Sequence, residues 1–293
     1  MTLPLVDTRV TYPAGALRAD TRVMHVAPAE GGLLAVVTES TSFHPVDAAW
    51  PDQPADAGVI RTATGDVVVV HDAVVAATDG EALHLGADIP VRPGTDGWAF
   101  VVAHLVDADA AIAEGDEVTI QADAATRRAL STGHTACHLA SLALNRVLAS
   151  RWSKPAREDA LGSPDFDGAA ISSSRITPDG SVDRYRLNKS LRRAGFDTAS
   201  LADDLEAVRR EVAEQLDAWI ATGGTVRVDA AGDGLTDRRT WVCELPDGTA
   251  RIACGGTHLT SLAELSAVVP SFALVDDGGT PVLEMTNEAR LRH

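Results

Sequence analysis

The sequence predicts an α+β protein, in which a small N-terminal β-barrel-like domain precedes a domain of long helices packed on a mainly antiparallel sheet. Three observations predict this class. Short β-rich segments separated by turn residues continue to about Gln121. Helical periodicity begins at Asp123, and several strand-like segments follow a second long helical stretch. We therefore expect a barrel-like domain over 1–121 and an α+β domain over 122–293.

The first domain is defined by regular alternation between strands and turns. Asp-Gly and Gly-Asp pairs separate several apolar runs, a spacing that favours a small barrel or sandwich. The expected strands are Leu33–Thr38, Asp66–His71, Ala82–Leu85, Ala99–Leu105 and Glu117–Gln121.

The second domain begins with a helix predicted over Ala124–Ser150. This stretch has no proline and one glycine, Gly133. Leu130, His134, His138 and Leu142 recur at four-residue intervals and so share one face of that helix.

The remaining elements follow from turn and cap signals. A second helix is expected from Ser200 as N-cap to Gly223-Gly224 as its stop, and a short helix from the capping box at Ser261. The expected strands are Ala169–Ile176, Val182–Leu187, Thr225–Val228, Thr240–Leu245, Ala250–Ala253, Val268–Val275 and Pro281–Met285.

Composition limits the classes of function. A chain of 293 residues with a formal net charge of -17 repels polyanions, so DNA binding is not expected and any tRNA contact requires a local basic patch. No apolar run is long enough to cross a bilayer, and no export signal is recognised at the N-terminus. Three cysteines do not make a disulfide framework. We expect a cytoplasmic protein, with Cys137 and Cys243 as buried apolar residues, and the sequence leaves its oligomeric state open.

Two short motifs far apart in the chain carry metal-binding side chains. His134 and His138 are four residues apart on the first helix, and Cys254 and His258 flank a glycine pair that indicates a turn. Three imidazoles and a thiolate suit zinc better than magnesium or calcium. We expect these four residues to hold one zinc ion per chain.

The segment from His134 to Leu139, together with Cys254 to His258, resembles the paired signature of one editing domain. That domain is shared by alanyl-tRNA synthetases and the free-standing AlaX-type alanyl-tRNA editing proteins, within the threonyl/alanyl-tRNA synthetase second additional domain superfamily. The likeness covers roughly residues 115–270 and includes Asp123 and Arg127 before the first motif. The second domain is thus expected to be an editing domain.

A weaker likeness extends into the N-terminal domain. Thr41, Phe43 and Pro45 match a Thr-x-Phe-Tyr-Pro element, and residues 53–58 match Gln-Pro-x-Asp-x-Gly. The chain departs from the family where His44 replaces the tyrosine and residues 47–52 replace a glycine run. Since this loop lines the amino-acid pocket in the family, the identity of the substrate is where the resemblance is weakest.

The resemblance implies hydrolysis, in trans and without ATP, of the ester that joins serine or glycine to an alanine-type tRNA. Its partner would be a tRNA acceptor end that carries an amino acid. Two alternatives stay open, a zinc hydrolase of small aminoacyl esters or amides and a non-catalytic, zinc-stabilised tRNA-binding module. The zinc either keeps an exchangeable fourth position for catalysis or is architectural.

Two residues outside the motifs are candidates for substrate contact. Thr41 could hydrogen-bond the substrate's hydroxyl, or else pair within a strand. Gln53 is expected on an exposed loop, where it could orient the ester or the amino group. His44 and His84 are spare imidazoles that are more typical of surface or satisfied core positions than of bases.

One basic cluster could contact tRNA phosphates, with Arg175 near it and Tyr185 available for stacking. The alternative is an ordinary solvated face. The cluster consists of Arg184, Arg186, Lys189, Arg192 and Arg193.

Overall fold

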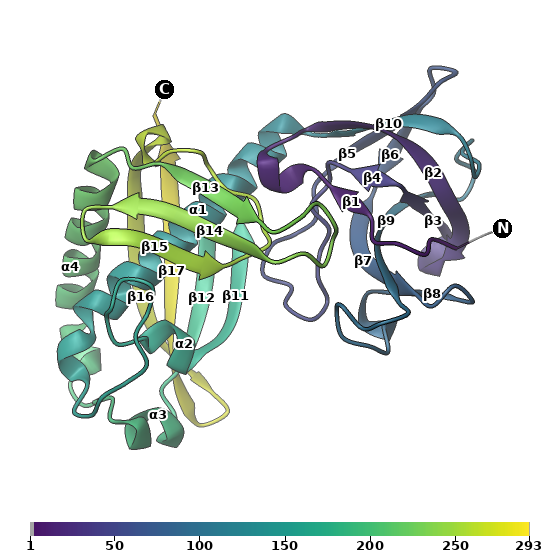
Figure 1. Ribbon diagram of the computed structural model, residues 1–293. Helices are drawn as coiled ribbons and strands as arrows, with labels where there is room; N and C mark the ends of the chain where they lie inside the picture. Colours follow the sequence, from purple (N-terminus) through teal and green to yellow (C-terminus); the bar gives the residue numbers. More distant parts are fainter. Residues whose placement is uncertain (1–2, 293) are drawn as a thin grey trace. The chain divides into compact units, whose positions relative to one another are not determined.

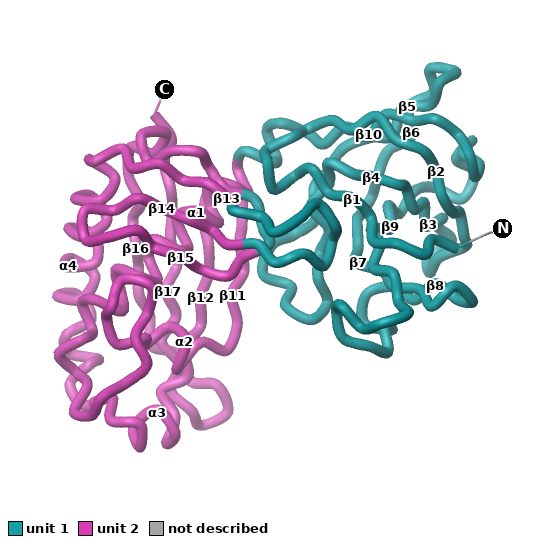
Figure 2. Tube along the Cα trace, in the orientation of Figure 1, with its two compact units in different colours: residues 1–128, 229–239, 255–257 teal, residues 129–228, 240–254, 258–293 magenta. Residues whose placement is uncertain are grey.

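The computed structural model describes residues 3–292, which form two compact units. Unit 1 lies within residues 1–128 and also takes in Asp229–Arg239 and Gly255–Thr257 (Figure 2). Unit 2 comprises Ala129–Val228, Thr240–Cys254 and His258–His293. The second metal motif, residues 254–258, therefore contributes to both units.

Unit 1 is built on an eight-stranded antiparallel sheet with strand order β6-β5-β10-β2-β3-β9-β7-β8 (Figure 1). A short parallel pair joins β1 (Arg9–Val10) to β4 (Ser40–Thr41). The strands of the larger sheet are β2 (Arg18–Ala29), β3 (Leu33–Thr38), β5 (Gly58–Thr62), β6 (Val67–Val70), β7 (Asp72–Thr78), β8 (Leu83–Leu85), β9 (Ala99–Asp107) and β10 (Glu117–Ala122).

The predicted barrel is not closed. Within residues 3–292, β6 and β8 stand at the two ends of the strand order and each pairs with one neighbour, so the hydrogen-bonded ladder does not return on itself. A three-residue strand such as β8 offers too few backbone groups to continue the ladder. The prediction of an α+β protein with mainly antiparallel sheets is confirmed.

Unit 2 contains two sheets, in which the pairs β11–β12, β12–β17, β16–β17 and β14–β15 are antiparallel. One sheet has the order β11-β12-β17-β16, and a three-stranded sheet has the order β13-β14-β15. The strands are β11 (Ile171–Thr177), β12 (Gly180–Arg186), β13 (Val226–Ala230), β14 (Arg239–Leu245), β15 (Gly248–Ala253), β16 (Leu265–Asp277) and β17 (Thr280–Leu291). The helices are α1 (Ala124–Val147), most of which lies in unit 2, α2 (Phe166–Ala170), α3 (Lys189–Ala194) and α4 (Leu201–Ala221).

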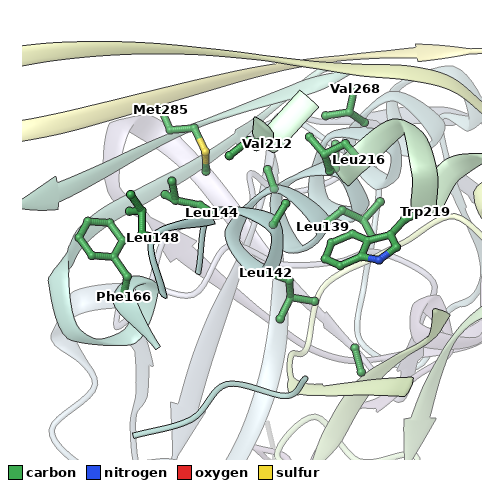
Figure 3. Close-up of a cluster of buried hydrophobic side chains, with 14 of the residues drawn as sticks. Leu139, Leu142, Leu144, Leu148, Phe166, Val212, Leu216, Trp219, Val268 and Met285 are labelled. Atoms are coloured by element: carbon green, nitrogen blue, oxygen red, sulfur yellow. The ribbon is translucent and has the colours of Figure 1, made fainter. Parts of the chain in front are cut away.

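The core of unit 2 forms where the apolar stripes of α1 and α4 meet side chains of β16 and β17. Burying a leucine side chain contributes about 1.5–3 kcal/mol, so this cluster is a main source of stability in the unit. Figure 3 shows Leu139, Leu142, Leu144, Val212, Leu216, Trp219, Val268 and Met285 in contact there, each at most 2% exposed.

Helix boundaries agree with the cap signals only in part. Helix α1 begins at Ala124 as predicted, because the Asp123 carboxylate accepts a hydrogen bond from Thr126 N at 2.8 Å. Ser200 precedes α4, but it does not cap it, since its hydroxyl donates to Asp204 at 2.8 Å. The segment after Ser261 is a single 3-10 turn, Leu262–Glu264, because β16 begins at the next residue.

The search for membrane-spanning helices among residues 3–292 finds none of sufficient length and apolarity.

Candidate metal centre

Helix α1 fixes the two histidines of the first motif. Their rings lie on one face, with centroids 4.8 Å apart. Gly133, the preceding residue, packs against the turn between β11 and β12, where an ideal Cβ would stand 2.3 Å from Gly180 O and 2.4 Å from Thr177 O. Only glycine permits this close approach, so the helix is set against the sheet one residue before His134.

The second motif follows strand β15 and brings its donors to the same point in unit 2. Cys254 Sγ lies 3.4 Å from His134 Nε2 and 3.3 Å from His258 Nε2. The four donor atoms of His134, His138, Cys254 and His258 all lie within 4.8 Å of one another. The predicted convergence of the two motifs is therefore present.

The surroundings of His138 and His258 favour metal binding. His138 Nε2 is buried and has no hydrogen-bond partner, and burial lowers the pKa of His138 to about 4, so its imidazole is neutral at pH 7. Thr135 Oγ1 lies 3.4 Å from His258 Nδ1 and also accepts the Leu259 N–H at 3.0 Å. A threonine acceptor at Nδ1 favours the tautomer whose Nε2 lone pair faces Cys254.

An aromatic wall lines one side of the cluster. The Trp241 ring, which is fully buried on β14, lies 4.9 Å from the His138 ring and 5.9 Å from the His258 ring, measured between centroids. Such a wall limits the movement of both imidazoles and lowers the local dielectric constant. Thr135 lies within the first motif and Trp241 on the strand that pairs with β15, and since neither is a metal-donor residue type, the donor pattern gave no signal for them.

The donor set fits zinc. In a tetrahedral site with Zn–S near 2.3 Å and Zn–N near 2.0–2.1 Å, sulfur and nitrogen stand about 3.6 Å apart, and the measured separations of 3.3–3.4 Å are close to this value. Hard cations such as calcium and magnesium require oxygen donors, and this cluster supplies none. A His₃Cys group that could bind a metal ion is thus present, with zinc as the ion that its chemistry favours.

Thr41 lies in unit 1 within a closed hydrogen-bond chain. His104 Nδ1 is 3.0 Å from the Val36 carbonyl, which can only accept, so His104 Nε2 is the acceptor for the Thr41 hydroxyl at 2.9 Å. Phe43 N donates to Thr41 Oγ1 at 3.0 Å, and both Thr41 and His104 are fully buried. The hydroxyl proton of Thr41 is therefore already used, and contact with a substrate stays a prediction.

Gln53 differs from its expected exposure, because its side chain is 1% exposed. Gln53 Nε2 donates to Thr257 Oγ1 and Gln53 Oε1 accepts from Thr257 N, both at 3.0 Å. This bidentate pair fastens the loop that carries Gln53 to the residue that precedes His258 in the chain. Gln53 thus acts on the second motif directly, whereas its role toward an ester or amino group stays a prediction.

A buried ion pair joins the two N-terminal segments that resemble the editing family. Arg127 binds both carboxylate oxygens of Asp56, with Nε at 2.8 Å from Oδ1, and donates to Ser42 O at 2.7 Å. Asp56 also accepts from His44 N. Arg127 thus ties the start of helix α1 to both of these segments of unit 1.

The spare imidazoles and thiols lie outside the cluster. His44 is buried, and desolvation lowers its pKa to about 4, while the His84 ring lies 5.5 Å from the Trp98 ring. Cys137 and Cys243 are buried as predicted, and burial raises the pKa of the Cys243 thiol to about 12. Both thiols therefore stay protonated near neutral pH, and neither belongs to the metal cluster.

The predicted basic cluster lies on β12 and α3 and is partly neutralised. Arg184 approaches Glu284 at 3.6 Å and Arg186 approaches Asp277 at 3.9 Å. Lys189, Arg192 and Arg193 are exposed. Tyr185 cannot stack on a base from this surface, because its ring points inward and is fully buried.

Comparison with known proteins gives one consistent relation. The chain is 26% identical over 275 residues to the alanine–tRNA ligase of Ruegeria pomeroyi, which covers 90% of this chain and 27% of the ligase. It is also 26% identical over 179 residues to the alanine–tRNA ligase of Nostoc punctiforme. That match covers 56% of this chain and 16% of the ligase. No protein-family model matches. The chain thus spans about a quarter or less of these ligases, and the similarity supports a relation to the alanyl-tRNA synthetase family.

Proposed function

We propose that this chain is a zinc-dependent hydrolase that acts in trans on mischarged aminoacyl-tRNA, as an AlaX-type alanyl-tRNA editing protein does. Its substrate would be the ester of serine or glycine on an alanine-type tRNA. The relation to alanine–tRNA ligases supports a role on tRNA. The chain acts without ATP under this proposal, since hydrolysis of an activated ester needs only water.

The observation that carries the proposal is the convergence of His134, His138, Cys254 and His258 within 4.8 Å. A zinc ion held there would polarise the ester carbonyl or lower the pKa of a bound water. The protein's own part is to present His138 as a neutral imidazole, to hold His258 through Thr135 and to exclude bulk solvent with Trp241.

Catalysis by this set requires one exchangeable position. Three of the four donors would stay bound while the fourth yields to water or substrate, since four fixed protein ligands complete a tetrahedron. Thr41 and Gln53 remain the proposed contacts to the amino acid, and each would have to exchange an internal hydrogen bond for one to the substrate.

The acceptor end of the tRNA would be held by Arg184, Arg186, Lys189, Arg192 and Arg193. The ion pairs of Arg184 and Arg186 are long and partly exposed, so each is worth little and a phosphate could displace the carboxylate. Charge reversal of Arg192 and Arg193 is expected to weaken tRNA affinity and to reduce its salt dependence by about two counterions. An unchanged salt slope would remove this cluster from the proposal.

The test is deacylation of seryl-, glycyl- and alanyl-tRNA beside small seryl and glycyl esters, each with zinc-loaded and chelated protein. The proposal predicts metal-dependent release of serine or glycine from tRNA and little release of alanine. Turnover of the small esters alone would favour a general aminoacyl esterase. Bound zinc and bound tRNA with no turnover would favour a structural, tRNA-binding role.

A further inference from the structure

One aromatic side chain stands out on the surface of unit 1. Among residues 3–292, Trp50 is the one aromatic residue among the exposed large hydrophobic side chains, with 48% of its surface accessible. Single exposed aliphatic residues are common, but an indole ring carries a large apolar area that interfaces and nucleic-acid sites use. The surroundings of the ring decide whether it has such a use.

The loop that carries Trp50 is fixed at both ends. At its start, Val46 pairs with strand β7 through Val46 N to Ala73 O at 2.8 Å and Val75 N to Val46 O at 3.1 Å. At its end, the bidentate pair between Gln53 and Thr257 fastens it to the second metal motif. The loop therefore presents Trp50 from a held backbone, three residues before the contact with that motif.

The ring itself is also oriented. Trp50 N donates to Asp47 O at 3.2 Å and Asp52 N donates to Trp50 O at 2.9 Å, which closes a turn around the residue. The Asp52 carboxylate accepts a hydrogen bond from the Trp50 side chain, so the polar edge of the indole is engaged within the loop. The apolar faces of the ring remain for contact with a planar group.

The charge of the loop restricts what that group can be. Residues 47–58 contain Asp47, Asp52 and Asp56 and no lysine or arginine. Phosphates would be repelled, whereas a neutral nucleobase is tolerated and the α-ammonium of an aminoacyl ester is attracted. Tyr185, the stacking residue expected from the sequence, is fully buried and leaves this role open.

We propose that Trp50 stacks on the terminal base of the RNA acceptor end and so positions the adjoining aminoacyl ester. This inference rests on the proposed function. Base–aromatic stacking tolerates any base, so Trp50 contributes affinity for a terminal nucleoside and leaves the choice of amino acid to other residues. The place of the contact is the loop that replaces the glycine run of the related editing domains.

Binding of the uncharged trinucleotide CCA to the full-length protein tests this inference without requiring hydrolysis. Quenching of tryptophan fluorescence and calorimetry report the affinity. Trp50→Ala is expected to weaken binding about 5- to 150-fold, and Trp50→Phe, which keeps a ring, to lose less than about fivefold. Trp98→Phe is the matched control, because Trp98 lies beside His84 on a different segment, and it should bind as the wild type does.

The outcomes separate the inference from the function on which it rests. If the protein deacylates tRNA and Trp50→Ala has the same KM as the wild type, the stacking role is wrong and the proposed hydrolase activity stands. Loss of CCA binding in Trp50→Ala, in a protein with no deacylase activity, would support the stacking role and remove the hydrolase. If Trp50→Ala instead converts a dimer to a monomer in sedimentation and CCA affinity is unchanged, the ring is a self-association contact and the inference is wrong.

Discussion

Two sets of polar side chains in this molecule, one in each unit, are organised in opposite ways. In unit 2, four donor atoms meet within 4.8 Å, and His138 Nε2 has no hydrogen-bond partner. In unit 1, Thr41, Gln53 and Asp56 direct their polar atoms to protein partners, namely His104, Thr257 and Arg127. The first set is arranged to receive an ion, and the second already resembles a finished structural network.

The difference teaches how far residue type predicts role. A buried polar group without a partner costs free energy, so the unpartnered Nε2 of His138 beside three further donors indicates a missing ligand. A buried group whose bonds are satisfied stabilises the fold whether or not it also meets a substrate. Changes at Thr41 or at the Asp56–Arg127 pair should therefore alter stability and spare metal binding, and changes of the metal donors should lower metal affinity.

The largest effect is expected from Arg127→Met. Removing one partner leaves the Asp56 carboxylate buried and unpaired, which costs about 3–5 kcal/mol in the free energy of unfolding. Denaturant unfolding measures this cost, and zinc content per folded chain should not change. Exposed Arg128→Met is the control and should shift the free energy by less than about 0.5 kcal/mol. Equal unfolding midpoints for the two variants would contradict the account of the network.

Acid should weaken unit 1 through His44 and His104. Their folded pKa values near 4 lie below the ordinary 6.5, so the unfolded chain binds more protons and stability is lost as pH falls from about 6.5 toward 4. Between pH 7 and pH 5 the loss is about 2 kcal/mol per histidine. His104→Gln should flatten the pH dependence, because it removes one of the two buried imidazoles. A wild-type stability that stays constant over this range would contradict the burial of both neutral rings.

The glycines of the two motifs should respond differently to alanine. Gly133→Ala places a methyl group against two carbonyl oxygens and is expected to cost about 1–3 kcal/mol, with a shift of α1 that also weakens zinc binding. Gly255→Ala meets nothing within 4 Å and should be tolerated. Thermal unfolding and zinc titration compare the two. A stable, zinc-binding Gly133→Ala protein would contradict the close packing of helix and turn.

The smallest effects are expected from the same substitution, threonine to valine, made once beside the metal cluster and once in unit 1. Thr135→Val removes the acceptor at His258 Nδ1 and should weaken zinc binding roughly tenfold. Thr41→Val removes the bond to His104 and should lower stability by about 1–3 kcal/mol with unchanged zinc affinity. Competition with a chromogenic chelator measures the zinc affinity of both. If both variants lose zinc affinity equally, the claim that the Thr41–His104 network is independent of the metal cluster is wrong.

Much of unit 2 could be predicted from sequence, because its elements are long and strongly periodic. The start of α1, the four-residue spacing of His134 and His138, and the donor pair around Gly255 follow from local rules. Their convergence required the pairing of distant segments, and the chemistry of the donors supplied that link.

Unit 1 was less predictable because several strands lack large inward residues. Strand β2 turns Ala19, Thr21 and Val23 inward, and this alternation is too weakly apolar to predict a strand. Strands β5 and β7 were not predicted either. His104 could have been found, since it is a lone imidazole in the apolar run of β9. The burial of Gln53 could not have been predicted, because it depends on Thr257, a partner 204 positions away in the sequence.

The most direct test of the central claim is the zinc content of the purified, metal-loaded chain by mass spectrometry. We predict about one zinc per chain for the wild type and for Cys243→Ala, whose buried thiol is not a donor, and a loss of bound zinc in Cys254→Ala. A wild-type protein that holds no zinc, or a Cys254→Ala variant that holds as much as the wild type with equal affinity, would contradict the assignment of these four residues to one metal site.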